Sequence, residues 1–352
     1  MKTLVLGGTG AIGIYLIQLL KEQGVEIFVT SRKKIESYGN VHYLQGDAKK
    51  FTFSQVCLQM HEWDVVVDFM VYNTQDFQKI VNLLLNNTKQ YVFLSSARVY
   101  AESKQPISEI SSRLLDVSED SEYLSTDEYA LTKARQEDIL KNSEFKNYTI
   151  IRPYITYSQN RLQLGVLEKE DWLYRALHGR TIVFSNDISS KTTTLTHGLD
   201  VAKALVAIIG NSKALGETFH ITRTESKKWN EILAIYLNTL EKQLGDKLKV
   251  SFQNLDDFLN IPCIGKYQVL YDRLFDRYFN NDKIAQYIDT SNFISIEEGL
   301  NKCIEEFLKD AQFKRINWQK QARMDKICNE RASLYEIQGI KQKVKYLFYR
   351  YY

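Results

Sequence analysis

A tyrosine and a lysine stand four residues apart at Tyr129 and Lys133, in a stretch with the pattern of a helix. Residues with this spacing lie on one face of an α-helix, so the phenol and the ammonium face the same way. The ammonium favours the phenolate and lowers a phenol pKa that is about 10 when unperturbed. The pair can therefore move a proton, and Ser96, a hydroxyl at the end of an apolar run, can hold the reacting oxygen.

A glycine-rich turn lies close to the start of the chain. Residues 7–13, with the sequence GGTGAIG, follow the apolar run at 4–6 and precede an amphipathic stretch at 15–22. Glycines at such a strand-to-helix junction permit a tight turn and a close backbone approach to phosphate oxygens, while the helix N-terminus offers N–H groups to the anion. The context predicts a dinucleotide site, with a nicotinamide exchanging hydride beside the Ser, Tyr and Lys side chains.

Short apolar runs alternate with helical patterns along the first half of the chain. The expected strands cover residues 3–6, 26–30, 41–44, 65–69, 91–95 and 148–152. This alternation predicts an α/β fold with a doubly wound parallel sheet that is covered on both faces. In the second half, helices are expected at 172–177, 200–210 and 229–244, and a strand at 181–184.

The composition is that of an ordinary globular protein. The 352 residues, 44% of them apolar, can fill one large two-lobed domain or two small ones, and a net charge of +3 is too small to indicate a nucleic-acid partner. Cys57, Cys263, Cys303 and Cys328 have the spacing of neither a zinc site nor a disulfide framework, so we expect isolated core thiols and no metal. The N-terminal apolar run is too short for a signal peptide or a membrane span, which predicts a cytoplasmic protein.

Over roughly residues 1–310 the chain resembles the NAD-dependent epimerase/dehydratase branch of the extended short-chain dehydrogenase/reductase superfamily. Five stretches carry the resemblance: GGTGAIG at 7–13, Gly46-Asp47, SSARVY at 95–100, YALTK at 129–133, and Ile151-Arg152-Pro153 leading into 193–202. The resemblance implies a Rossmann-type dinucleotide-binding domain at 1–160 with a returning segment at about 190–220, and a smaller substrate lobe mostly at 161–310. Residues 311–352 are left as a helical C-terminal extension.

The resemblance also assigns the site residues. Ser96, Tyr129 and Lys133 are the expected catalytic residues. The expected cofactor-binding residues are Gly7, Thr9, Gly10, Ala11, Ile12, Gly13, Ser31, Arg32, Asp47, Ala48, Phe69, Tyr129 and Lys133. Arg98 and Tyr154 are candidate substrate contacts, although Arg98 could equally pair with the acidic stretch 103–127. Relatives commonly form homodimers through a helix bundle that includes the Tyr–Lys helix.

The end of the second strand bears on the choice of cofactor. Residues 30–34, Thr-Ser-Arg-Lys-Lys, lack the carboxylate that would hydrogen-bond an NAD ribose, and no acidic residue occurs before Glu36. Arg32 can pair with a 2′-phosphate, which a carboxylate would repel. The sequence therefore favours NADP(H), with NAD(H) as the alternative and Arg32 as a solvated loop charge in that case.

The residues after Ser96 bear on the reaction. Relatives that dehydrate sugar nucleotides place an Asp-Glu pair there, whereas this chain has Ala97 and Arg98, so dehydration is disfavoured. Ketone reduction, alcohol oxidation and epimerisation through a transient ketone need only the Ser, Tyr and Lys side chains. The expected substrate is a sugar or nucleotide sugar, in surface-polysaccharide or other carbohydrate synthesis. The alternative is a catalytically silent NAD(P)-binding module with a regulatory or RNA-binding role.

Two further stretches and one histidine complete the expectations. The acidic stretch 103–127 could be a flexible cover over the site or a solvated insertion. His197, before the returning helix, is expected to be a helix cap. A terminal helix at 337–352 carries the apolar stripe Ile340, Val344, Leu347, Phe348 and Tyr351 among basic residues. That stripe could dock on the body, on a second subunit, or on an anionic membrane surface.

Overall fold

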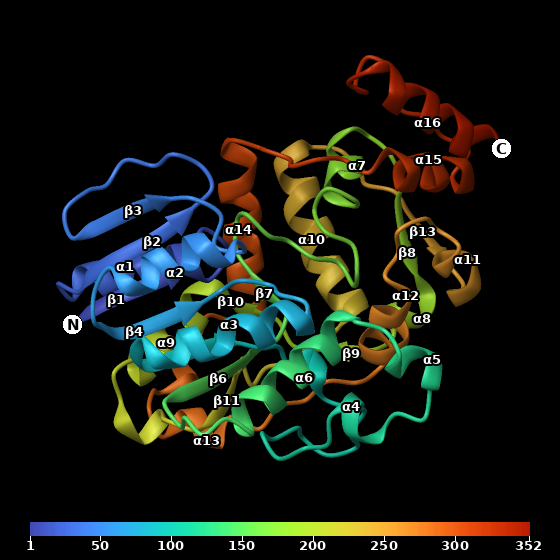
Figure 1. Ribbon diagram of the computed structural model, residues 1–352. Coiled ribbons are helices and arrows are strands. Elements are labelled where there is room, and N and C mark those ends of the chain that lie inside the picture. The colour runs from blue at the N-terminus through green and yellow to red at the C-terminus, as the bar shows by residue number, and fades with distance from the viewer. The chain divides into compact units, whose positions relative to one another are not determined.

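The computed structural model describes all residues, 1–352, and Figure 1 shows the order of the elements along the chain. The chain divides into two compact units. Unit 1 comprises Met1–Thr156, Thr194–Glu225 and Tyr278–Ile294, and unit 2 comprises Tyr157–Thr193, Ser226–Arg277 and Ser295–Tyr352.

Unit 1 is built on a seven-stranded parallel sheet in the order β11-β6-β5-β4-β1-β2-β3. The strands are β1 (Lys2–Leu6), β2 (Glu26–Ser31), β3 (Val41–Gln45), β4 (Trp63–Asp68), β5 (Thr88–Leu94), β6 (Tyr148–Pro153) and β11 (Thr218–Ile221). Val5 of β1 lies opposite Val29 on one side and Val67 on the other. The strand order reverses between β1 and β4, and in such sheets ligands bind at the carboxyl ends beside this reversal.

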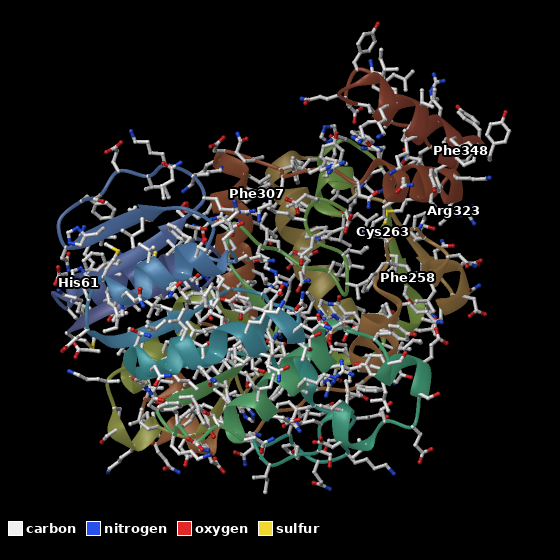
Figure 2. The ribbon with its side chains drawn as sticks, viewed as in Figure 1. His61, Phe258, Cys263, Phe307, Arg323 and Phe348 are labelled. Carbon is white, nitrogen blue, oxygen red and sulfur yellow. The ribbon has the colours of Figure 1, made fainter.

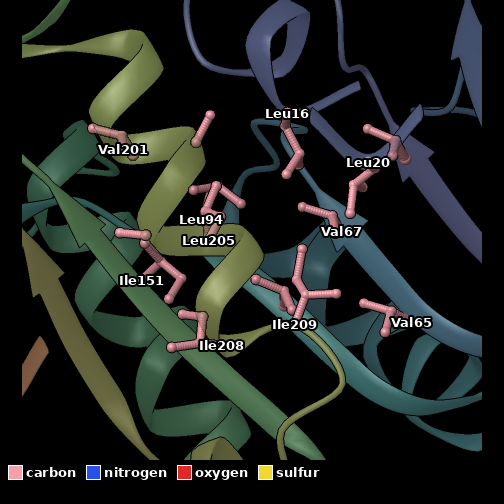
Figure 3. Close-up of a cluster of buried hydrophobic side chains, with 14 of the residues drawn as sticks. Leu16, Leu20, Val65, Val67, Leu94, Ile151, Val201, Leu205, Ile208 and Ile209 are labelled. Atoms are coloured by element: carbon pink, nitrogen blue, oxygen red, sulfur yellow. The ribbon is translucent and has the colours of Figure 1, made fainter. Parts of the chain in front are cut away.

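Helices cover both faces of this sheet. They are α1 (Gly13–Glu22) and α9 (Gly198–Ile208) on one face, and α2 (Phe51–Gln59), α3 (Thr74–Asn86) and α6 (Tyr129–Lys141) on the other. Successive strand residues point to opposite faces, so Val5 packs with Leu16 and Leu205, whereas Leu4 packs with Phe77 and Leu84. Figure 3 shows the first of these two cores. The predicted doubly wound, Rossmann-type fold is confirmed.

The rest of unit 1 consists of short elements. These are the 3-10 turns η1 (Ala97–Val99), η2 (Ser212–Ala214) and η4 (Thr290–Asn292), the helices α4 (Leu114–Val117), α5 (Ser121–Leu124) and α13 (Asp282–Ala285), and the strand β10 (Thr196–His197); β7 (Thr156–Tyr157) lies at the boundary. Residues 278–294 belong here, not with the second lobe to which the sequence analysis assigned them. Their attachment is through Ile107, whose N–H donates to Tyr278 O at 2.7 Å and whose carbonyl accepts from Asn280 N at 2.8 Å.

Unit 2 combines two small strand pairs with helices. Parallel β8 (Ile182–Ser185) and β13 (Val250–Gln253) form one pair, and antiparallel β9 (Thr192–Thr193) and β12 (Lys227–Lys228) form the other. The helices are α7 (Leu173–Leu177), α8 (Asn186–Ser189), α10 (Trp229–Leu244), α11 (Leu255–Leu259), α12 (Lys266–Gln268), the π-turn η3 (Val269–Arg273), α14 (Ile296–Lys309), α15 (Trp318–Ile327) and α16 (Ile340–Tyr351).

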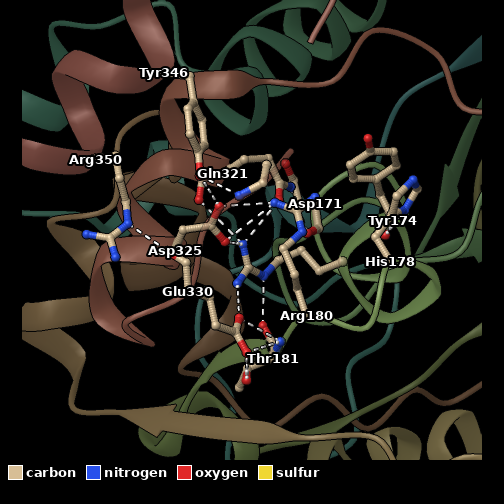
Figure 4. A network of polar contacts seen from close by, with 12 residues as sticks. Asp171, Tyr174, His178, Arg180, Thr181, Gln321, Asp325, Glu330, Tyr346 and Arg350 are labelled. Carbon is tan, nitrogen blue, oxygen red and sulfur yellow. Dashed lines mark hydrogen bonds and ion pairs between the residues drawn. The ribbon is translucent and has the colours of Figure 1, made fainter. Parts of the chain in front are cut away.

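A buried polar network fixes the C-terminal helices within unit 2 (Figure 4). Asp325 of α15 accepts from Arg175 at 2.6 Å, from Arg180 at 3.1 Å and from the Tyr346 hydroxyl of α16 at 2.6 Å. Arg175 and Asp325 are fully buried, so removing either side chain would leave an unpaired buried charge and destabilise the fold. Residues 311–352 are thus the expected helical C-terminal extension, and they belong to unit 2.

The expectation that the apolar stripe of the last helix docks on the body is wrong. Ile340, Val344 and Phe348 are 81%, 61% and 57% exposed, whereas Tyr346, which is not in the stripe, is 1% exposed. The amphipathic pattern identified the helix but not its buried side, because Tyr346 uses its hydroxyl to reach Asp325. No helix of the chain combines the length and the apolar character needed to cross a bilayer.

The cysteines follow the expectation only in part. Cys57 and Cys303 are buried, as core thiols should be, and Cys328 is half-buried, whereas Cys263 is exposed. The expectation of four core thiols is therefore wrong for Cys263, which lies at a backbone position with φ of 61°.

Candidate active site

The glycine turn forms the end of β1 and the start of α1. Gly7 has φ of 76°, a left-handed conformation that favours glycine, and its N–H donates to the Thr30 hydroxyl at 3.0 Å. Thr9 and Gly10 at the tip are exposed. A Cβ at Gly10 would meet no atom within 4 Å, and Ile12, which precedes the helix, supplies no capping side chain. No capping side chain therefore occupies the start of α1, where Ile14 N donates to Gly10 O at 3.3 Å and Tyr15 N to Ile12 O at 3.1 Å. An uncapped helix N-terminus after a glycine turn is suited to a bound pyrophosphate.

Two other glycines let neighbouring backbone approach this turn. A Cβ at Gly13 would lie 2.2 Å from Gly8 O, and one at Gly198 would lie 2.1 Å from Ala11 O. Helix α9 therefore begins directly against the turn, a contact that sequence reasoning missed. The His197-Gly198 pair at the start of the returning helix was the available indication. His197 itself is confirmed as a cap, because its Nδ1 accepts from Leu199 N at 3.1 Å.

The next strand ends bring the other expected cofactor residues to the same edge of the sheet. Ser31 ends β2 and its hydroxyl accepts from Lys33 N at 3.2 Å, while Arg32 after it is exposed. Asp47 follows β3 and caps its own turn by accepting from Lys49 N at 3.1 Å. Ala48 beside it is buried, with its carbonyl accepting from Ser54. Phe69 follows β4 and is held to β1 through Leu6 O.

Ser96 comes directly after β5. It begins the 3-10 turn η1, where its hydroxyl accepts from Arg98 N at 3.2 Å. Ser95 has a different role, since its hydroxyl donates to Glu137 at 2.5 Å. Glu137 also accepts two bonds from the Arg152 guanidinium, at 2.5 and 2.8 Å, so α6, β5 and β6 are tied together beneath Ser96. Neither this pair nor its partnership with Ser95 was foreseen from the sequence.

Tyr129 and Lys133 lie on the first turns of α6. Glu128 caps this helix by accepting from Ala130 N at 2.7 Å, which fixes the start of the helix at Tyr129. The Lys133 ammonium lies 6.0 Å from the centre of the Tyr129 ring and 4.4 Å from that of Phe93. The predicted same-face arrangement of phenol and ammonium is thus present in the structure.

A buried carboxylate, Asp68, stands close enough to Lys133 to act on its charge. Asp68 ends β4 opposite Phe93, and it accepts from the Tyr91 hydroxyl and from Met70 N, each at 2.8 Å. Burial raises the pKa of Asp68 to about 6. Burial lowers the pKa of Lys133 to about 8, and the charges of Asp68 and Glu137 oppose this lowering. Asp68 was not predicted from the sequence, although an acidic residue directly after the apolar run Val65-Val66-Val67 could have indicated it.

Arg98 forms an ion pair instead of standing open to a substrate. Its guanidinium donates to Glu128 at 2.5 Å and lies 5.4 Å from the centre of the Tyr129 ring. Of the two expected roles, an ion pair is the one the structure shows, although its partner Glu128 lies one residue beyond the acidic stretch 103–127. Through this pair the turn that carries Ser96 is joined to the start of α6.

The acidic stretch 103–127 folds against α6. Arg113 donates to Asp116 at 2.8 Å and to Asp138 of α6 at 3.1 Å, and Arg135 of α6 donates to the carbonyl oxygens of Leu124 and Thr126. The stretch therefore packs on α6 with part of its charge paired, while Glu119 and Glu122 are exposed, as expected for a solvated insertion.

Tyr154, the second expected substrate contact, is 1% exposed and its ring centre lies 5.2 Å from that of Phe279. The open space beside Tyr129 is instead a cavity of about 400 Å³ between the starts of α3 and α6. Its lining residues are Lys49, Val71, Tyr72, Asn73, Asp76, Asp127, Tyr129 and Thr132. A phenol in such a cavity, with a buried cation on its own helix, is suited to proton transfer.

Comparisons with known proteins agree with this architecture. At 27% identity, the chain matches a chloroplast stem-loop binding protein of 41 kDa from Arabidopsis thaliana over 63% of this chain, spanning 58% of that relative. Two solved structures share the fold. One is the Bordetella bronchiseptica enzyme WbmH in complex with NAD+ (14% identity, TM-score 0.69, 88% of this chain and 99% of that one). The other is UDP-glucuronic acid 4-epimerase from Bacillus cereus with UDP-glucuronic acid and NAD (18% identity, TM-score 0.64, 87% and 100%).

A family model covers the segment that carries the turn, Ser96 and the Tyr–Lys helix. The match spans residues 3–222, more than half of the chain, and it includes every site residue discussed above. The glycine turn and the strand ends fit the dinucleotide that this family uses. The chain belongs to the NAD-dependent epimerase/dehydratase family.

Proposed function

We propose that the protein is an NAD(P)-dependent epimerase or ketoreductase that acts on a sugar, with a nucleotide-linked sugar as the favoured substrate. The observation that carries the proposal is that η1, which Ser96 caps, packs on α6, the helix that carries Lys133 and the cavity-lining Tyr129. The glycine turn lies at the carboxyl edge of the same sheet. A binding-only module would not require this combination.

In this proposal each of the three side chains has one task. Tyr129 gives or takes the proton of the reacting oxygen, and Ser96 holds that oxygen. Lys133 stays protonated near the phenol, where its charge stabilises the phenolate, and it binds the nicotinamide ribose. The nicotinamide, when bound, supplies or accepts the hydride.

Dehydration is not part of the proposal. It would need an acid and a base next to Ser96, but Ala97 is buried and has no polar side chain, and Arg98 is engaged with Glu128. Ketone reduction and epimerisation through a transient ketone need only the proton transfer at Tyr129. They are therefore the two reactions that we retain.

The substrate class draws support from the structural neighbours, one of which is a UDP-glucuronic acid 4-epimerase. The direct test is to incubate the purified protein with UDP-glucuronic acid and UDP-glucose and to separate the products by chromatography. New epimers would support the proposal, and so would oxidation of NADPH when a 4-keto sugar nucleotide is supplied as the substrate. Absence of any change with nucleotide sugars of several classes would contradict the substrate assignment.

The charge of Lys133 makes activity depend on pH. Because its pKa is about 8, we expect turnover to fall as the pH rises through that value. Asp68→Asn removes a negative charge that favours the protonated lysine, so the alkaline limb of the profile should move to lower pH. Asp64→Asn is the matched control, since Asp64 lies at the other end of β4 with Lys89. An alkaline limb unchanged by Asp68→Asn would remove Asp68 from the account.

Arg32 is proposed to favour NADP(H). It follows β2, is exposed, and would reach a 2′-phosphate on the adenosine ribose. Arg32→Asp should weaken NADPH binding by about tenfold or more, because a charged hydrogen bond is replaced by repulsion. Fluorescence titration with NADPH and NADH measures this, with the exposed Arg331→Asp as control. An unchanged ratio of the two affinities would assign Arg32 to solvent and leave NAD(H) as the cofactor.

The second candidate function is a catalytically silent module that binds RNA. The name of the Arabidopsis relative, a stem-loop binding protein, favours it. In that case the protein would shift the mobility of a stem-loop RNA and would leave every nucleotide sugar unchanged.

The homodimer stays a prediction. The outward positions of α3, which would share a helix bundle with α6, are Gln75, Asp76, Gln78, Lys79, Asn82 and Asn86. These polar residues would give an interface at this place little apolar surface to bury.

A further inference from the structure

We propose that the C-terminal helix α16 binds the surface of an anionic membrane, with a basic pocket beside it that receives a lipid headgroup. The proposal is independent of the reaction, because it rests on unit 2 alone. It goes beyond the amphipathic pattern in the sequence, since it depends on which side of the helix is buried.

The buried side of α16 is fixed by Tyr346. This ring is 1% exposed, and its hydroxyl donates to Asp325 at 2.6 Å and accepts from Ala332 N at 2.6 Å. At ~100° per residue, Val344, Phe348 and Tyr351 point within about 40° of the opposite direction. Turning the apolar face inward would therefore break the buried hydrogen bonds of Tyr346 with Asp325 and Ala332. Phe348 of the apolar face is labelled in Figure 2.

Basic residues lie on both sides of this apolar face. Residues 337–352 contain Lys341, Lys343, Lys345 and Arg350 and no aspartate or glutamate. The three lysines form no ion pair, although Arg350 Nε donates to the Glu330 carbonyl. An exposed apolar face with cationic flanks and aromatic side chains is the composition of a helix that lies in the headgroup region of an anionic bilayer.

A basic pocket adjoins the helix. It has a volume of about 280 Å³ between the start of α15 and α16, and it is lined by Arg315, Asn317, Gln342 and Lys345 among others. Arg315 and Lys345 are both exposed. The amide of Asn317 already caps α15 by accepting from Gln319 N and Lys320 N, so the pocket's attraction for an anion comes from the two cations. A phosphate headgroup is small enough to enter while α16 lies on the surface.

The same observations disfavour the two other occupants. A second copy paired through α16 would bring two cationic helices together without a carboxylate from either helix to compensate them. A nucleic acid would be attracted to the lysines but would leave Ile340, Val344 and Phe348 in water. Only a membrane surface satisfies the apolar face and the charges at once.

The test is flotation of the full-length protein with phosphatidylcholine vesicles, prepared with and without phosphatidylglycerol. Binding is expected only with the anionic lipid, and it should weaken at high salt. Arg315→Ala/Lys345→Ala should reduce the partition coefficient by about 25-fold, about fivefold for each charge near the surface. Val344→Glu/Phe348→Glu should abolish binding. Val56→Glu is the matched control, because Val56 of α2 is as exposed as Val344, at 61%.

Three outcomes would overturn the proposal. The first is absence of binding to anionic vesicles by the wild-type protein, and the second is binding that the Val344→Glu/Phe348→Glu protein retains. The third is a dimer in light scattering, or a complex with RNA, that forms without lipid and is lost in that variant. Circular dichroism of each variant confirms that a loss of binding is not a loss of fold.

Discussion

Replacing Tyr129 by phenylalanine should reduce turnover by about 10²–10⁴-fold while the protein keeps its affinity for the dinucleotide. The substitution removes only the hydroxyl of Tyr129, a residue that lines the cavity at the start of α6. The ring can keep its place beside the Arg98 guanidinium, and the glycine turn that binds the pyrophosphate is untouched. Turnover is measured with the nucleotide sugar that the wild type converts, and cofactor affinity by fluorescence titration.

Tyr287→Phe is the matched control for this variant. The Tyr287 hydroxyl donates to Lys213 O at 3.3 Å, before β11 begins, and therefore near the amino edge of the parallel sheet. It should leave turnover unchanged. If Tyr129→Phe retained wild-type turnover, the proposed proton transfer by the Tyr129 hydroxyl would be wrong. The fold and the cofactor site would not be affected by that result.

Glu137→Gln should have the largest effect on stability, a loss of about 3–5 kcal/mol. Glu137 is fully buried and neutralises Arg152, which is 1% exposed, so the neutral amide leaves a buried guanidinium without a counter-charge. Burial alone would raise the pKa of Glu137, yet the hydrogen bonds from Arg152 and Ser95 bring it below its usual value. The wild type should therefore lose this contribution as the pH falls through that depressed pKa, and the variant should not.

The urea midpoint measures the effect of Glu137→Gln. Glu144→Gln, at an exposed carboxylate just beyond α6, is the control and should leave the midpoint in place. Replacing both partners, Glu137→Leu/Arg152→Leu, should cost less than the single change because no charge is stranded. A single variant as stable as the control would show that this pair does not hold α6 to β6.

The parts of the molecule that follow local rules could be predicted from the sequence. The six expected strands occur, with bounds that shift by three residues at most, because strand-helix alternation and apolar runs are local patterns. The glycine turn and the spacing of Tyr129 and Lys133 are local as well. The seventh strand, β11, is only four residues long and was included only within a returning segment.

Features that depend on contacts between distant residues could not be predicted. Asp68 and Lys133 are separated in the sequence by α3, β5, η1, α4 and α5, and the sequence does not show that both enter one buried region. The contact of Gly198 with Ala11 needs α9 in place against the turn. For Arg98 the sequence left a substrate phosphate and an acidic partner as equal alternatives, and only the fold shows that Glu128 is the partner.

The proposed function requires that unit 1 hold a nicotinamide dinucleotide for catalysis. The most direct measurement is to purify the protein without added cofactor, denature it, and identify released nucleotides by mass spectrometry, followed by titration of any empty protein with NADPH and NAD+. We expect one of two results. Release of NAD+ or NADP+ from the denatured protein would indicate an enzyme that recycles its hydride, and saturable binding of a cofactor by empty protein would indicate a reductase. A protein that releases no nicotinamide nucleotide and binds neither cofactor would contradict the proposed function.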